Sequence, residues 1–60
     1  MEELEKLLLN VSDTYDDFVF GVMNAVKKDP EGRQMLIDFI KNNPEKDSSD
    51  IIDYMDEIGV

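Results

Sequence analysis

The side chains of this chain that could carry out chemistry are carboxylates, hydroxyls and lysines, because the sequence contains neither histidine nor cysteine. Histidine is the commonest general base at neutral pH, and cysteine is the most reactive side-chain nucleophile. The adjacent carboxylates Asp16 and Asp17 could act as an acid and base pair only inside an apolar pocket that shifts one pKa. Since a chain of 60 residues encloses little volume, we expect no catalytic site and no cofactor, and we predict that the protein is not an enzyme.

A second acidic group lies near the end of the sequence. Asp50, Asp53 and Glu57 recur at spacings of three and four residues, which places them on one side of a helix. Such carboxylates can contact Mg²⁺ or Ca²⁺, but a calcium loop needs alternating oxygen ligands, a central glycine and a closing glutamate. Residues 47–51 lack that order. We therefore interpret this stripe as a solvated helix face and expect no metal site.

The charge balance restricts the partners of the chain. Its 15 acidic and 6 basic residues give a net charge of -9, which repels phosphate backbones and anionic lipid surfaces. No apolar run approaches the roughly 18 residues that a membrane span needs, and the start Met1-Glu2-Glu3 is unlike a basic signal peptide. We expect a cytoplasmic protein that binds neither nucleic acid directly nor membranes.

The hydrophobic pattern predicts one all-α domain over residues 1–60, built as a small bundle of three helices, or of four. From about 2 to 28, apolar residues recur at alternating steps of four and three, as on one face of a helix. Within residues 10–14 the poor helix formers are Asn10, Ser12, Asp13 and Thr14, and Thr14 with Asp17 resembles a capping box. The pattern leaves one continuous helix and two helices with a break near 10–14 as open alternatives.

Two further helices follow. Asp29, Pro30 and Glu31 form a helix start, which predicts a helix over 30–42 that ends before Pro44.

A last helix is predicted over 49–58, capped by Ser48 or Ser49, with Gly59 near its end. Each helix has one apolar face to bury against the others. The predicted core consists of Leu4, Leu8, Val11, Phe18, Val22, Val26, Leu36, Phe39, Ile40, Ile51 and Met55.

Several large apolar side chains lie off these faces. Phe20 points well over 100° away from the apolar direction of its helix, so it is either an interface anchor or packed under a neighbouring helix. Apolar residues outside the core form patches of the kind that mark contact surfaces. We therefore predict a protein-interaction module or a self-associating subunit, such as a homodimer, with an interaction surface of Leu9, Phe20, Ile37 and Ile52.

Residues 35–60 resemble the opening of a winged-helix or helix-turn-helix domain. An apolar helix is followed by Asn43-Pro44, a polar loop, Ser48-Ser49 and an apolar pair at 51–52. In that family two such helices support a third, basic recognition helix that enters the major groove, and here the sequence stops where that helix would begin. The resemblance implies a two-helix corner. The second functional hypothesis, beside the protein-interaction module, is a nucleic-acid-linked regulator, either a degenerate helix-turn-helix or an acidic DNA mimic.

The whole chain also looks similar to short acidic proteins of Gram-positive bacteria. That resemblance implies a bacterial protein and no particular activity.

Overall fold

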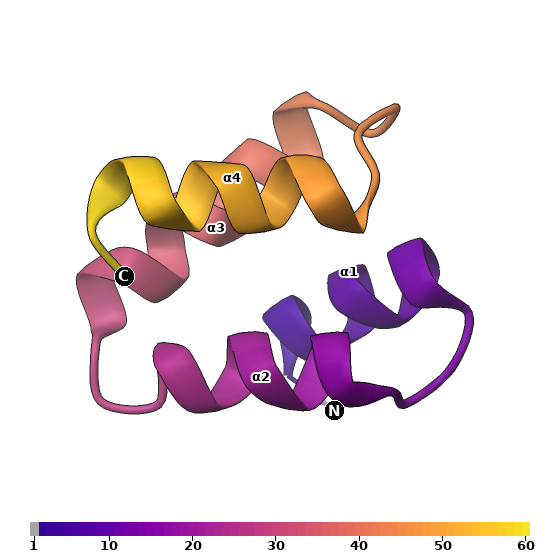
Figure 1. Cartoon of the computed structure of the whole chain (residues 1–60), viewed down its shortest axis with the longest axis horizontal. Coiled ribbons are helices and arrows are strands. Elements are labelled where there is room, and N and C mark those ends of the chain that lie inside the picture. Colours follow the sequence, from indigo (N-terminus) through magenta and orange to yellow (C-terminus); the bar gives the residue numbers. More distant parts are fainter. Residues whose placement is uncertain (1) are drawn as a thin grey trace.

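A computed structural model describes residues 2–60, and over that range the chain is all-helical, with four helices joined by short turns (Figure 1). The bundle predicted from the sequence is confirmed in its four-helix form. The segment predicted as a helix over 2–28 is interrupted at 13–16 and ends before 28. The helices are α1 (Glu3–Ser12), α2 (Asp17–Ala25), α3 (Pro30–Asn42) and α4 (Ser48–Ile58).

The break between α1 and α2 has a local cause at each end. Asp13 adopts a φ of 67°, in the left-handed region, and its N–H donates to the Leu9 carbonyl at 2.7 Å, which ends α1. The Asp16 carboxylate then accepts a hydrogen bond from the Val19 N–H at 3.2 Å and caps α2. The cap predicted at Thr14 is wrong, because Asp16 is the residue that directly precedes the helix.

The start of α3 is as predicted. The Asp29 carboxylate accepts a hydrogen bond from the Gly32 N–H at 2.9 Å, and Pro30 occupies the first helical position, where its missing N–H costs nothing. The helix ends at Asn42, directly before the Asn43-Pro44 stop signal. This part of the chain is specified by signals within a few residues of each boundary.

The cap of α4 differs from the prediction, because Asp47 rather than Ser48 or Ser49 caps this helix. The Asp47 carboxylate accepts the Asp50 N–H at 3.1 Å, and the Asp50 carboxylate accepts the Asp47 N–H at 3.3 Å. This reciprocal capping box satisfies two free amides, and α4 therefore starts at Ser48, one residue before the predicted start. At the other end Gly59, with a φ of 78°, closes the helix as predicted.

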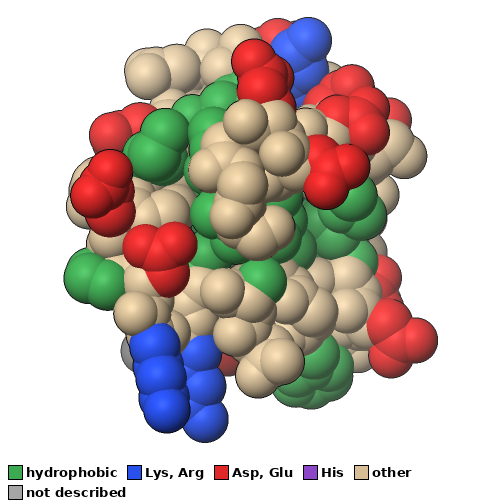
Figure 2. Space-filling view, turned by 60° about the vertical axis from the view of Figure 1, so that its left-hand side comes forward, with side chains coloured by type: hydrophobic (Ala, Val, Ile, Leu, Met, Phe, Trp, Pro, Cys, Tyr) green, Lys and Arg blue, Asp and Glu red, His purple; other side chains and the backbone are tan. Residues whose placement is uncertain are grey.

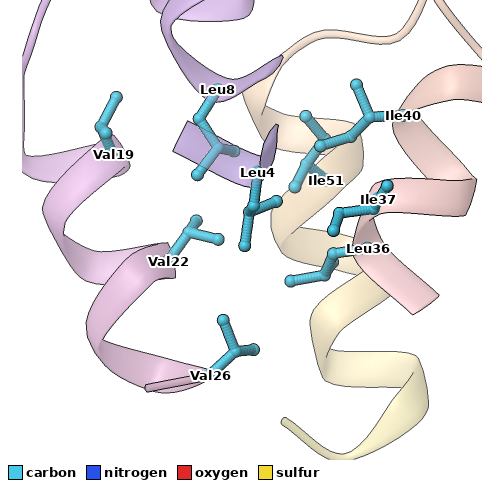
Figure 3. Close-up of a cluster of buried hydrophobic side chains, with 9 residues drawn as sticks. All are labelled: Leu4, Leu8, Val19, Val22, Val26, Leu36, Ile37, Ile40 and Ile51. Carbon is cyan, nitrogen blue, oxygen red and sulfur yellow. The ribbon is translucent and has the colours of Figure 1, made fainter. Parts of the chain in front are cut away.

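The hydrophobic core is made of aliphatic side chains that all four helices contribute (Figure 3). Four residues predicted for the core, Val11, Phe18, Phe39 and Met55, are only partly buried and pack against its edge. We call the buried set the aliphatic core; it consists of Leu4, Leu8, Val19, Val22, Val26, Leu36, Ile37, Ile40 and Ile51.

Two core residues were not predicted, and each has a structural reason. The turn at 13–16 resets the direction of α2, so Val19 faces inward where one continuous helix would have buried Phe18. Ile37 is buried because α3 packs against both α1 and α4, which widens its buried face. The Glu2–Arg33 and Glu3–Lys41 ion pairs further hold the start of α1 on α3.

Candidate functional site

The aromatic side chains of this protein lie outside the aliphatic core. The chain has two tyrosines and three phenylalanines, all of them within the described residues, and each is exposed or only partly buried. Phe39 and Tyr54 stack with ring centroids 4.1 Å apart and join α3 to α4 at the surface. Aromatic side chains dominate the energetics of protein interfaces, so exposed aromatic side chains indicate candidate contact surfaces.

One aromatic surface lies beside α1 and α2, and we call it the aromatic flank, formed by Tyr15 and Phe20. The two rings stack with centroids 5.5 Å apart, and Phe20 is 59% exposed. The Tyr15 hydroxyl donates to the Glu5 carboxylate at 2.5 Å, and this hydrogen bond raises the pKa of Tyr15 above its ordinary value. Of the two alternatives left open for Phe20, packing under a neighbouring helix is wrong, since the ring is mostly exposed and belongs to a stacked pair that Tyr15 links to α1.

A second apolar surface is a hollow between α2 and α4, two helices that run in the same direction in Figure 1. It has a volume of about 210 Å³. On the face shown in Figure 2, hydrophobic side chains reach the surface between Asp and Glu side chains. We call this hollow the α2–α4 groove; its apolar lining comprises Phe18, Gly21, Val22, Ile52, Met55 and Val60, and its charged lining residues are Asp17 and Asp56.

Neighbouring residues of α4 show how the groove and the core divide the apolar side chains. Ile51 is 1% exposed and belongs to the aliphatic core, whereas Ile52 is 51% exposed and lines the groove. Successive residues of a helix point about 100° apart, so one helix can serve both regions. Ile52 is a large β-branched side chain that stays half-exposed to water, so its burial contributes less to folding than that of Ile51.

The four residues predicted as an interaction surface do not lie together. Ile37 is 6% exposed in the aliphatic core, so its prediction as a surface residue is wrong. Leu9 is half-buried and packs against the aliphatic core, whereas Phe20 is exposed in the aromatic flank. Ile52 lies in the α2–α4 groove. A binding role for any of them stays a prediction.

Sequence reasoning missed most of the groove lining. The apolar pattern predicts Phe18 and Met55 in the core and indicates no role for Gly21 or Val60. The sequence did carry a signal for Gly21, because a glycine inside a helix lowers the stability of the helix and usually has a packing or functional role. A Cβ atom added at Gly21 would meet nothing within 4 Å, so no contact inside the chain supplies that reason.

A larger hollow of about 440 Å³ lies at the loop before α4, with Leu7, Val11, Ile40 and Pro44 among its lining residues. Its charged lining residues are Lys41, Lys46 and Asp47. The Lys41 ammonium is paired with Glu3, whose hydrogen bond raises the pKa of Lys41.

The Asp47 carboxylate at this hollow caps α4. Two of its three charged groups, Lys41 and Asp47, therefore already have partners within the chain, which leaves them less available to orient a small ligand.

One carboxylate of the acidic stripe on α4 has a structural role, since Asp50 belongs to the capping box of this helix. Among residues 2–60, no three acidic side chains are placed to hold one metal ion. Over the same range, none of the helices combines the length and the apolar character that crossing a bilayer requires.

Comparisons with protein-family models, curated protein sequences and solved structures find no match to this chain. The resemblance of residues 35–60 to a helix-turn-helix domain therefore stays a prediction.

Proposed function

We propose that the protein is a protein-interaction module that binds a partner in the α2–α4 groove. The observation that carries this proposal is the exposure of Ile52 beside a hollow lined with apolar side chains. Phe18 and Met55 pack against the aliphatic core from this side, so the hollow has a firm apolar floor. Contiguous exposed apolar surface with a polar rim is typical of contact sites.

The aromatic flank is a weaker candidate for the main contact. Phe20 already stacks on Tyr15, and neither ring lines either of the two hollows described above. Interface energy concentrates where an anchor side chain enters a pocket and loses its contact with water. The groove offers such a pocket, and the flank offers a flat stacked pair.

Photocrosslinking tests this proposal. A photoreactive benzophenone side chain is placed at Ile52 in one variant and at Phe20 in the other, and each is irradiated in lysate from source cells. We expect a discrete adduct at position 52 that is absent at position 20, with mass spectrometry locating the crosslinked partner peptide. An adduct of two copies of this chain would identify self-association as the interaction.

Adducts at position 20 alone would contradict the groove as the binding site. No adduct at either position would contradict the proposal that the protein is an interaction module.

A further inference from the structure

We infer that the partner of the α2–α4 groove is an amphipathic helix that carries lysine or arginine beside its apolar residues. This inference rests on the proposed function and adds the chemistry of the partner. It follows from the size of the groove, the charge of its rim and the position of one glycine.

The size of the groove selects side chains over whole small molecules. Its volume of about 210 Å³ lies below the roughly 300–1,000 Å³ that small-molecule sites occupy, but it admits one or two aliphatic side chains. Among the described residues no strand is present, so a partner cannot add a strand to a sheet edge here. A helix laid along the groove between α2 and α4 inserts apolar residues at helical spacing, which is a common mode of peptide recognition.

The charge of the rim selects a basic partner. The charged residues that line the groove are Asp17 and Asp56, in a chain of net charge -9. A lysine or arginine that flanks an apolar anchor would lie within reach of these carboxylates and gain electrostatic complementarity. A second copy of this chain would instead bring carboxylates towards carboxylates, which disfavours self-association in the groove.

Gly21 provides an independent observation. It lies in the middle of α2 and lines the groove, and a Cβ atom there would have open space around it. The chain therefore carries a helix-weakening residue that its own packing does not require. The missing side chain leaves the α2 backbone bare at the groove wall, where a partner helix can approach closely.

Three designed peptides test the inference by calorimetry and by NMR shifts of the backbone amides. The first is an amphipathic helix of leucine and lysine, the second replaces each lysine with glutamate, and the third has the first composition in scrambled order. We expect the ordered leucine and lysine peptide to bind and to shift amides of groove residues. The other two should bind at least about tenfold more weakly.

Matched variants locate the contact. Ile52→Gln should weaken binding of the leucine and lysine peptide by about five- to tenfold, while Phe20→Gln, which removes a similarly exposed apolar side chain elsewhere, should leave it unchanged. The double variant Asp17→Asn with Asp56→Asn should weaken binding and flatten its salt dependence. The control with the same charge change, Glu45→Gln with Glu57→Gln, should weaken it less.

The outcomes separate this inference from the proposed function. Equal binding of the lysine and glutamate peptides in the groove would overturn the basic partner and leave the interaction module standing. Shifts spread over acidic residues outside the groove, or loss of binding in Phe20→Gln alone, would overturn the assigned site. Absence of groove shifts with every peptide would overturn the inference, and crosslinking at Ile52 would still decide the proposed function.

Discussion

The aliphatic core and the α2–α4 groove draw on the same helices but use different apolar side chains. The core contains leucine, valine and isoleucine, whereas the groove exposes Phe18, Ile52 and Met55 beside a bare glycine. Val22 is shared, since it is buried in the core and also forms part of the groove wall. The difference shows that this small chain keeps its bulkiest apolar groups out of its interior, although burying them would stabilise the fold.

Substitutions in the aliphatic core and in the groove should differ most in how far they lower the free energy of unfolding. Leu36→Ala removes a fully buried side chain and should lower the free energy of unfolding by about 2–5 kcal/mol. A chain of 60 residues has roughly 3–9 kcal/mol in total, so this variant should be close to unfolding. Ile52→Ala, at a half-exposed position, should cost less than about 1 kcal/mol. Urea denaturation followed by circular dichroism measures both, and equal losses would contradict the division into core and groove.

Alanine substitution of the two helical glycines should change the free energy of unfolding by smaller amounts and in opposite directions. A Cβ atom at Gly32 would lie 2.5 Å from the Asp29 carboxylate and 3.1 Å from Val60, so Gly32→Ala should disturb the cap of α3. We expect the loss of the cap to exceed the gain in helix propensity and to lower the free energy of unfolding by roughly 0.5–1 kcal/mol. Gly21→Ala should raise it by a similar amount. Denaturation of both variants checks the signs, and stabilisation by Gly32→Ala would show that its close packing is dispensable.

The smallest effect concerns the aromatic flank and its pH dependence. The hydrogen bond to Glu5 raises the pKa of Tyr15, so the folded state holds the phenolic proton to higher pH than the unfolded state does. The stability from this contact is complete below the ordinary tyrosine pKa and is lost as the pH rises through the folded-state value. Glu5→Gln should lower the pKa of Tyr15, measured by phenolate absorbance in a Tyr54→Phe background. Glu3→Gln should leave it unchanged, and an unshifted pKa in Glu5→Gln would contradict the contact.

Sequence signals predicted this fold where they were local. The Asp29 carboxylate accepts a hydrogen bond from a free amide of the helix start and Pro30 occupies the first helical position, so that start was predictable from neighbouring residues alone. The break after α1 depends on Asp13 and Asp16, two of several polar residues in that stretch, and the sequence left the choice between one helix and two open. Local chemistry set the boundaries, and competition among similar residues decided which aspartate caps α2.

The candidate site was less predictable because it depends on how the helices face one another. The assignment of Phe18 to the core followed from one continuous helical stripe, and the turn at 13–16 rotated that residue to the edge. Ile37 lies off the apolar stripe of its helix, and it is buried because α3 packs against both α1 and α4. Ile52 was identified correctly as surplus to the core, but its neighbours across the groove come from another helix, which a one-helix pattern cannot reveal.

If the groove side of α2 is shaped for a partner at some cost to folding, Gly21→Ala should weaken partner binding while it strengthens the helix. The measurement is the affinity of this variant for the amphipathic leucine and lysine peptide, with Asn24→Ala as a control that also raises helix propensity in α2 but lies outside the groove lining. We expect Gly21→Ala to bind the peptide about threefold or more weakly, although its helix is more stable. An affinity equal to or higher than that of the unsubstituted chain would contradict it.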